Sequence, residues 1–350
     1  MGFCHKRNMA IEIIGTGRAV PPKKVSNDEL ASQVDTTDEW IKSHTGIENR
    51  HYAEESVACS DLAAEAAINA LAMAAGYRGD DPAQRDKAAA EIAPTIDTII
   101  LATATADYYG TPSTACIVQH KIGAKNAAAM DITAGCTGFV YGLEIASGLL
   151  NVSPQRKRAL VIGSEILSKM MNWEDRKTCV LFGDGAGTVV LEKTEGASGL
   201  QKTLMYADGS GAGSLVMRRG GTRSPFKKGE TIDAPICVEM NGQEVYNFAV
   251  GAMSDTIKAL MESSNLNIDD IAWIIPHQAN ARIVKAARLR LHIPAEKFYM
   301  NIEEYANTSA ATIPIALDEM NRSGQLKKGD KILTVGFGGG LTYGGNIIIW

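Results

Sequence analysis

The segment AAMDITAGCTGFVYGLEIAS, residues 128–147, passes from an apolar strand into a helix. Behind Cys136, apolar side chains recur at helical spacing, at Phe139, Leu143, Ala146, Leu149 and Leu150. Cys136 therefore stands where the helix begins, beside unsatisfied backbone N–H groups and the positive end of the helix dipole. Both favour a thiolate, so we expect Cys136 to be a nucleophile. The alternative is a buried structural cysteine, and motifs further along the chain decide between the two.

The bulk composition excludes several classes of protein. Of 350 residues, 45% are hydrophobic and 21% are charged, which is typical of a globular protein. A net charge of −5 gives no reason to expect binding to nucleic acid, and no apolar run approaches the length of a membrane span. The six cysteines are scattered without a CxxC pair, which argues against a zinc site and a disulfide framework. We expect a cytoplasmic protein with no metal.

The two halves of the chain repeat one pattern of strands and helices. Segments of similar type begin at Asp97 and Asp270, at Met130 and Met300, and at Arg158 and Lys331, offsets of 173, 170 and 173 residues. A near-constant offset indicates a duplicated α/β unit, with mixed sheets and helices packed between and outside them. We expect one half over residues 1–195, which carries the cysteine, and a second over 196–350.

Three polar residues each follow a predicted strand and open a loop or helix: Cys136, His277 and Asn307. Side chains at strand ends can meet over one pocket. Taken singly, His277 could be an ordinary loop histidine and Asn307 a helix cap. The glycines at 338–340 could also bring backbone N–H groups close, so the three residues together favour a functional site.

Six ordered motifs resemble those of β-ketoacyl-acyl-carrier-protein synthase III. They are GCTGF at 135–139, PHQAN at 276–280, ANTSAA at 306–311, FGGG at 337–340, DEWI with TGI at 38–41 and 45–47, and FGDGAG at 182–187. The resemblance runs from about Ile11 to Trp350. It implies an α/β protein of thiolase-like fold, with two duplicated halves in five layers, α-β-α-β-α, and usually a homodimer.

The resemblance also implies a reaction. Cys136 would take an acyl group from an acyl-CoA, with the backbone N–H groups of Cys136 and Gly339 as the oxyanion hole. Malonyl-acyl-carrier protein would then lose CO2, and His277 and Asn307 would donate hydrogen bonds to the enolate oxygen. The carbanion would attack the acyl group and give a 3-oxoacyl-acyl-carrier protein, which initiates fatty acid biosynthesis. No cofactor is implied, because the CoA thioesters are substrates.

Further positions match the family's contacts with CoA and pantetheine: Trp40, Arg176, Asn280 and Arg282. From the sequence alone, Trp40 could equally belong to the core. Arg282, Lys285 and Arg288 form a basic stripe at helical spacing. This stripe is either a solvated helix face or a dock for the acidic carrier protein.

The chain departs from the family at two other positions. His44 stands where many members have an arginine that meets CoA. Thr111 appears where some members have a phenylalanine that closes the acyl channel across the dimer, so we expect room for a longer or branched primer. Residues 79–94 are expected to form an inserted surface segment with a short helix.

Three other functions compete with this interpretation. A related starter enzyme of secondary metabolism would use the same three residues on an unusual acyl-CoA or on malonyl-CoA. A thiolase would need a second cysteine in the glycine loop, and residues 336–345 contain none. A silent partner subunit that only binds acyl chains or carrier protein would not need Cys136, His277 and Asn307 together.

Overall fold

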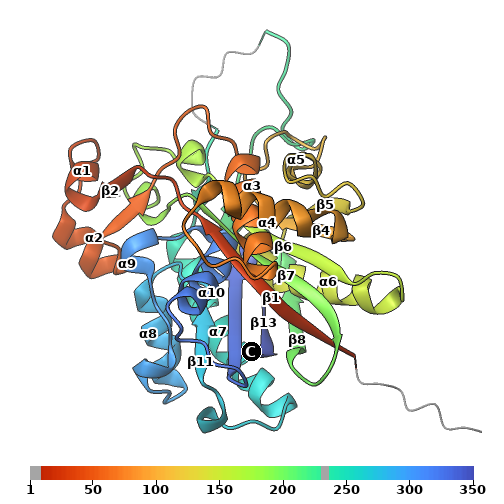
Figure 1. The fold of residues 1–350 in the computed structure, drawn as a ribbon. Helices are drawn as coiled ribbons and strands as arrows, with labels where there is room; N and C mark the ends of the chain where they lie inside the picture. Colours follow the sequence, from red (N-terminus) through yellow and green to blue (C-terminus); the bar gives the residue numbers. More distant parts are fainter. Residues whose placement is uncertain (1–8, 230–235) are drawn as a thin grey trace, which may run out of the picture.

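The computed structural model describes residues 9–229 and 236–350 and contains two large β-sheets (Figure 1). In spatial order, the first sheet consists of β1 (Met9–Ala19), β7 (Gly185–Glu195), β6 (Arg158–Glu165), β4 (Thr98–Ala102) and β5 (Ala128–Ile132). β4 runs parallel to β5 and β6, whereas β7 is antiparallel to β6 and to β1. Every residue of β4 is buried, as its continuous apolar run predicts.

The second sheet repeats this arrangement. Its strands, in order, are β11 (Trp273–Pro276), β12 (Lys331–Gly338), β13 (Thr342–Ile349) and β8 (Gly199–Ala207). β11 and β12 are parallel, and the remaining pairs are antiparallel. A parallel bridge from Phe298 to Ile274 stands where β5 stands in the first sheet. The duplication predicted from the sequence is therefore present in strand order and direction.

Helices complete five layers. α3 (Cys59–Ala74) covers the outer face of the first sheet, and α7 (Gly242–Ser263) and α8 (Ala281–Arg290) cover that of the second. α6 (Gly138–Val152) and α10 (Thr312–Arg322) lie between the sheets, because each contacts strands of both (Figure 1). This α-β-α-β-α order confirms the predicted fold class. β7 ends at Glu195 and β8 begins at Gly199, and we propose that the halves 1–195 and 196–350 divide in this connection.

The remaining elements are short or peripheral. The helices are α1 (Asn27–Ala31), α2 (Asp38–Thr45), α4 (Pro82–Ile92), α5 (Thr114–Lys121) and α9 (Ile302–Tyr305). The short strands pair as β2 (Lys24–Ser26) with β3 (Asn49–His51), and as β9 (Leu215–Val216) with β10 (Glu239–Met240). The segment 79–94 contains α4, which packs on α3 through the buried Ala89.

Close packing of α6 on the first sheet fixes the loop that precedes this helix. An added Cβ at Gly138 would lie 2.6 Å from the Cβ of Ala102, and one at Gly142 would lie 2.8 Å from Cγ1 of Val161. Glycine at both positions lets the helix backbone approach the strands. Phe139, the next residue along, is fully buried in the core between the two sheets. The start of α6 is therefore held rigidly above β4 and β6.

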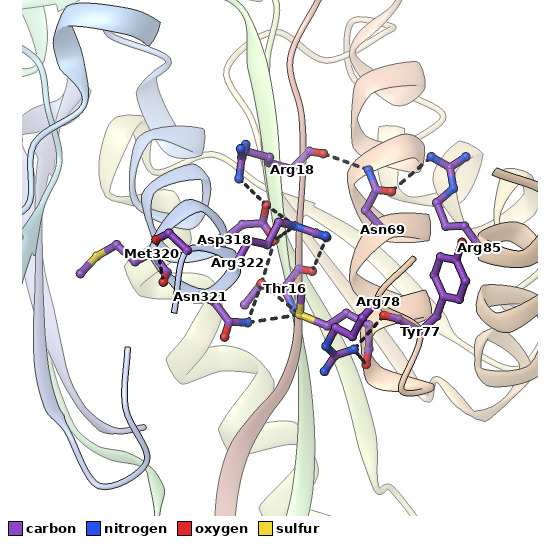
Figure 2. Close-up of polar contacts among 12 residues, drawn as sticks. Thr16, Arg18, Asn69, Tyr77, Arg78, Arg85, Asp318, Met320, Asn321 and Arg322 are labelled. Carbon is purple, nitrogen blue, oxygen red and sulfur yellow. Dashed lines mark hydrogen bonds and ion pairs between the residues drawn. The ribbon is translucent and has the colours of Figure 1, made fainter. Parts of the chain in front are cut away.

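A buried carboxylate joins the central layer to the first sheet (Figure 2). Asp318 on α10 is fully buried and accepts hydrogen bonds from Thr16 Oγ1 at 2.8 Å and Arg18 Nη1 at 2.8 Å. Arg322 Nε contacts both carboxylate oxygens, at 2.9 and 3.0 Å. The carbonyl of Arg18 accepts a hydrogen bond from Asn69 on α3 at 3.0 Å, so the network reaches the outer helix layer.

In the ranges 9–229 and 236–350, no helix has both the length and the apolar character needed to cross a bilayer. The same residues contain no cluster of histidine, cysteine and acidic side chains that could hold a metal ion.

Candidate active site

Cys136 lies in a one-turn 3₁₀ helix, Gly135–Thr137, between β5 and α6. The glycine loop after β12 backs directly onto this turn. An added Cβ at Gly338 would lie 2.4 Å from the backbone nitrogen of Cys136, and one at Gly135 would lie 2.7 Å from that of Gly339. Gly135 also has a φ of +52°, which favours glycine. The two loops can come this close only because neither carries side chains there.

Cys136, His277 and Asn307 line one cavity of about 410 Å³. The three residues belong to different elements, and Cys136 and His277 are 141 residues apart in the sequence. The packing of the two sheets brings these elements together. Trp40 and Arg282 line the same cavity toward its outer end. The convergence expected from the strand ends is present in the structure.

A second cavity of about 460 Å³ meets the first at Cys136. Cys136, Phe182 and Leu215 line both cavities. The other side chains around the second cavity are mostly apolar and include Leu167, Met170, Val216, Met217 and Val238. Gly339 also lines it. A group attached to the Cys136 sulfur therefore has an apolar space on one side and, on the other, the cavity that His277 and Asn307 line.

The expected lowering of the Cys136 pKa is absent. Burial raises the pKa of this thiol to about 12, although a side-chain hydrogen bond with Ser309 and its own backbone N–H act in the opposite direction. The prediction that Cys136 is ionised was wrong. Burial removes the thiolate from water, and the free-energy cost of this is larger than the stabilisation of the anion by these hydrogen bonds. Cys136 is therefore a thiol near neutral pH.

His277 follows β11 and is held in place by its backbone and its ring. Its N–H donates to the carbonyl of Val335 at 2.7 Å, and Nδ1 lies 2.8 Å from Thr312 Oγ1. Phe337 meets the imidazole edge-on, with ring centroids 5.0 Å apart. Burial lowers the pKa of His277 to about 3, so the ring is neutral near pH 7. A neutral imidazole donates from one nitrogen and accepts at the other.

Asn307 is fixed by the FGDGAG segment that precedes and enters β7. Its N–H donates to the carbonyl of Leu181 at 3.0 Å, and its own carbonyl accepts from the N–H of Gly183 at 3.1 Å. The side-chain Oδ1 accepts from the N–H of Ser309 at 2.8 Å. Because Oδ1 is committed there, the Asn307 side chain presents its NH2 donors to the cavity that it lines.

The outer end of the first cavity is formed by α2 and α8. Trp40 is half-buried and stacks on His44 with ring centroids 4.5 Å apart, and the Arg176 guanidinium lies 5.7 Å from the Trp40 ring. His44 Nδ1 donates to the Trp40 carbonyl at 2.8 Å. Asn280 donates to the carbonyl of His44 at 3.1 Å, and Arg282 Nε donates to that of Ser43 at 3.1 Å.

The other predicted positions line neither cavity. Lys285 is exposed on α8 and Arg288 is half-buried one turn further on. Thr111 is exposed in the loop between β4 and α5 and lines neither cavity of its own chain. Arg176 touches the site through Trp40 rather than by lining the cavity.

Sequence reasoning missed three polar residues close to the site. Ser309 and Thr312 lie within or just after the ANTSAA motif, and their contacts with Asn307 and His277 depend on the fold. Glu165 ends β6 and is fully buried. The one available signal was a charged residue at the end of the apolar run Ala159–Gly163.

The site contains a cysteine between an apolar cavity and a second cavity that a neutral histidine and an amide also line. Together with the duplicated five-layered fold, this defines a thiolase-fold condensing enzyme that transfers acyl groups. Family models described as 3-oxoacyl-[acyl-carrier-protein (ACP)] synthase III and its C-terminal part match residues 130–209 and 261–350.

Curated relatives cover nearly the whole chain. The β-ketoacyl-[acyl-carrier-protein] synthase III of Clostridium acetobutylicum is 46% identical over 97% of this chain and 99% of its own length. That of Clostridium perfringens strain SM101 is 48% identical over 96% and 98%. The chain belongs to the β-ketoacyl-[acyl-carrier-protein] synthase III family.

Solved structures agree in fold. The 3-oxoacyl-[acyl-carrier-protein] synthase III of Aquifex aeolicus superposes with a TM-score of 0.84 at 40% identity, covering 97% of this chain and all of that one. A priming β-ketosynthase of the R1128 polyketide pathway gives a TM-score of 0.86 at 29% identity, covering 100% and 98%. Relatives at 45–48% identity carry the synthase III name, so they do not favour the secondary-metabolism alternative.

Proposed function

We propose that this protein joins an acyl-CoA primer to malonyl-acyl-carrier protein, with loss of CO2, through an acyl-Cys136 intermediate. The product is a 3-oxoacyl-acyl-carrier protein, which initiates fatty acid biosynthesis. The observation that carries the proposal is the place of Cys136 where the apolar cavity meets the pocket lined by His277 and Asn307. An acyl chain and a second thioester can then reach the same sulfur from different sides.

In the first half-reaction the Cys136 sulfur attacks the acyl-CoA carbonyl and CoA leaves. The backbone N–H groups of Cys136 and Gly339 are the proposed oxyanion hole, and the close approach of their two loops supports this role. A preorganised donor of this kind is worth about 3 kcal/mol in the transition state. The apolar lining of the second cavity accepts the hydrocarbon part of the primer.

In the second half-reaction malonyl-acyl-carrier protein loses CO2 and charge develops on its thioester oxygen. The NH2 group of Asn307 and a ring N–H of His277 donate to that oxygen. The fixed Oδ1 of Asn307 and the neutral state of His277 support these roles. The carbanion then attacks the acyl carbonyl on Cys136, and the cysteine thiolate is released and reprotonated.

The outer end of the first cavity holds the nucleotide and pantetheine of CoA. Trp40 offers a ring face to adenine, and Arg176 and Arg282 supply positive charge for phosphate. Asn280 keeps one amide hydrogen for pantetheine, since its other contacts cap α8 and hold His44. His44 stands where many members of the family have an arginine that meets CoA, and it stacks on Trp40 instead.

The basic stripe Arg282, Lys285 and Arg288 is the proposed dock for the acidic carrier protein. It lies on α8, whose first turn lines the cavity that leads to Cys136. Complementary charge there speeds the encounter between the two proteins.

The protein is further proposed to be a cytoplasmic homodimer that needs no cofactor. β5 is an edge strand of the first sheet, and Met130 on it is exposed. An unpaired edge of this kind is a ready surface for a second copy.

In such a dimer, Thr111 would meet the partner's acyl cavity and leave room for longer primers. A comparison of turnover between acetyl-CoA and medium-chain acyl-CoAs tests this, and a strict preference for acetyl-CoA contradicts it.

A two-part assay tests the function. Cys136→Ala should abolish formation of 3-oxoacyl-acyl-carrier protein but still release CO2 from malonyl-acyl-carrier protein, because His277 and Asn307 remain. His277→Ala should show the opposite, a cysteine that becomes acylated without later condensation. Purified wild-type protein that forms no 3-oxoacyl product from any acyl-CoA tried would contradict the proposal.

A further inference from the structure

Glu165 is a fully buried carboxyl group with no part in the reaction described above. It accepts hydrogen bonds from Thr105 Oγ1 at 2.8 Å, from Ser309 Oγ at 3.0 Å and from the N–H of Ala104 at 3.1 Å. Thr103 Oγ1 contributes a longer contact at 3.3 Å. All four partners donate to the carboxylate, which is the pattern that an ionised or proton-accepting group requires.

Ser309 connects Glu165 to the nucleophile. Its hydroxyl donates to Glu165 Oε1 and also interacts with the Cys136 sulfur. The hydrogen bond with Ser309 lowers the Cys136 pKa, so it favours the thiolate, to which the hydroxyl donates. A serine hydroxyl has one proton, so Ser309 can donate to the carboxylate or to the sulfur but not to both at once. Ser309 and Cys136 both line the apolar cavity, and the Ser309 N–H is fixed by Asn307 Oδ1. The hydroxyl is therefore held between the sulfur and the carboxylate.

His277 is not placed to do this work. The Nδ1 atom of its ring is engaged with Thr312, whereas the Cys136 sulfur interacts with Ser309. Among the described residues, the charge of Glu165 raises the pKa of two neighbouring thiols, Cys136 and Cys59. Cys59 bonds to Ser164 and Thr103, and Thr103 contacts Oε2 of the carboxylate, whereas Ser309 contacts Oε1.

We propose that Glu165 receives the proton of the Cys136 thiol through Ser309 during acylation. As the Sγ–carbon bond forms, the thiol proton moves to Ser309 Oγ and the Ser309 proton moves to Glu165 Oε1. The carbonyl electron pair moves to oxygen, then returns as the bond to the CoA sulfur breaks. The proton goes back from Glu165 through Ser309 to the departing CoA sulfur, so the enzyme regains its starting charge. Glu165 does not touch the reacting atoms and acts only through Ser309, so it is a positioning residue. The inference rests on Cys136 being the proposed nucleophile.

The ionisation of Glu165 is suited to this role. Burial raises the pKa of Glu165 to about 7, and the hydrogen bonds from Thr105, Ala104 and Ser309 partly offset this by lowering it. A proton acceptor is most useful when its pKa lies near the working pH. The acylation rate of the wild-type protein should accordingly rise with pH and level off above about pH 7.

The test uses the full-length protein and two rates over pH 6–9. One is single-turnover acylation by acyl-CoA, and the other is alkylation of Cys136 by iodoacetamide, located by peptide mass spectrometry. Glu165→Gln and Ser309→Ala should each slow both rates roughly 100-fold at pH 7.5. In both variants the plateau above about pH 7 should also disappear. Both rates should then rise about tenfold per pH unit, because hydroxide removes the Cys136 proton in place of the relay.

Thr103→Val is the matched control, because it removes a contact with the same carboxylate and leaves Ser309 in place. Its rates should stay within about threefold of the wild type. If Glu165→Gln does not fold, the two rates of Ser309→Ala alone test the relay. A plateau that persists in Ser309→Ala or in folded Glu165→Gln overturns the relay. A wild-type Cys136 that is alkylated but never acylated overturns the proposed function instead.

Discussion

The Nδ1 atom of His277 lies 2.8 Å from the hydroxyl oxygen of Thr312. The same hydroxyl lies 3.1 Å from the carbonyl of Ser309. It has one proton, so it can donate to the ring or to the carbonyl. Only donation to Nδ1 leaves the proton of the neutral ring on Nε2, where it can reach a substrate oxygen. The proposed role of His277 as a donor therefore depends on Thr312.

Replacement of this hydroxyl should separate the two half-reactions. Thr312→Val keeps the side-chain shape and removes the donor to Nδ1, so we expect decarboxylation of malonyl-acyl-carrier protein to slow about tenfold. Acylation of Cys136 should stay within about twofold of the wild type. CO2 release and single-turnover acylation measure the two steps. Thr312→Ser, which restores a hydroxyl, should recover decarboxylation, and equal losses in both steps would show that Thr312 only supports the fold.

The ionisation of Glu165 should appear in the stability of the protein. Its pKa in the folded protein, about 7, is above the ordinary value of 4.5, so the folded state binds this proton more tightly. The stabilisation is complete below about pH 4.5 and is lost as the pH rises through about 7. From this group alone, the free energy of unfolding should fall by about 3 kcal/mol between pH 4.5 and 8.

Urea unfolding of the wild type and Glu165→Gln at several pH values checks this. The difference in stability between the two proteins should change in favour of the glutamine variant as the pH rises. A difference that stays constant from pH 5 to 8 would mean that Glu165 keeps one charge state over that range.

The network around Asp318 should matter for stability and not for catalysis. Asp318→Ala leaves Arg18 and Arg322 without their buried partner, and we expect a loss of about 3 kcal/mol in unfolding free energy, since both arginines keep some contact with water. Glu262→Gln is the control, because its pair with Lys258 on α7 is exposed and should contribute less than about 0.5 kcal/mol. Similar losses in the two variants would show that burial of Asp318 has no energetic effect.

The basic stripe on α8 should act on one substrate only. Lys285→Glu is expected to raise KM for malonyl-acyl-carrier protein about tenfold at low ionic strength and to leave KM for acyl-CoA unchanged. The effect should shrink in high salt, because exposed charges are screened. Lys258→Glu, a reversal at an exposed lysine on α7, is the control. If both reversals change KM equally, the effect is one of net charge and the dock is elsewhere.

The sequence was sufficient for the fold because its information there is local and periodic. The apolar runs that became β4, β6, β11 and β12 recur at a fixed offset, and strand order follows from that repetition. The convergence of Cys136 with His277 was also predictable, since both follow strands of equivalent sheets.

The ionisation of the site was not predictable in the same way. The pKa of Cys136 depends on how completely the surrounding layers exclude water, and no motif records that. The contacts of Glu165 with Ser309, 144 residues apart, likewise depend on the two sheets being in place. Short-range patterns therefore predicted three residues that line one cavity, but they gave the wrong charge for Cys136.

The central claim is that acyl-CoA transfers its acyl group to Cys136. Incubation of the protein with acyl-CoA, followed by intact and peptide mass spectrometry, measures this directly. We expect a mass gain of one acyl group on the peptide that contains Cys136, and its loss when malonyl-acyl-carrier protein is added. An unmodified Cys136 across a panel of acyl-CoAs, or an acyl group on another cysteine, would contradict the account.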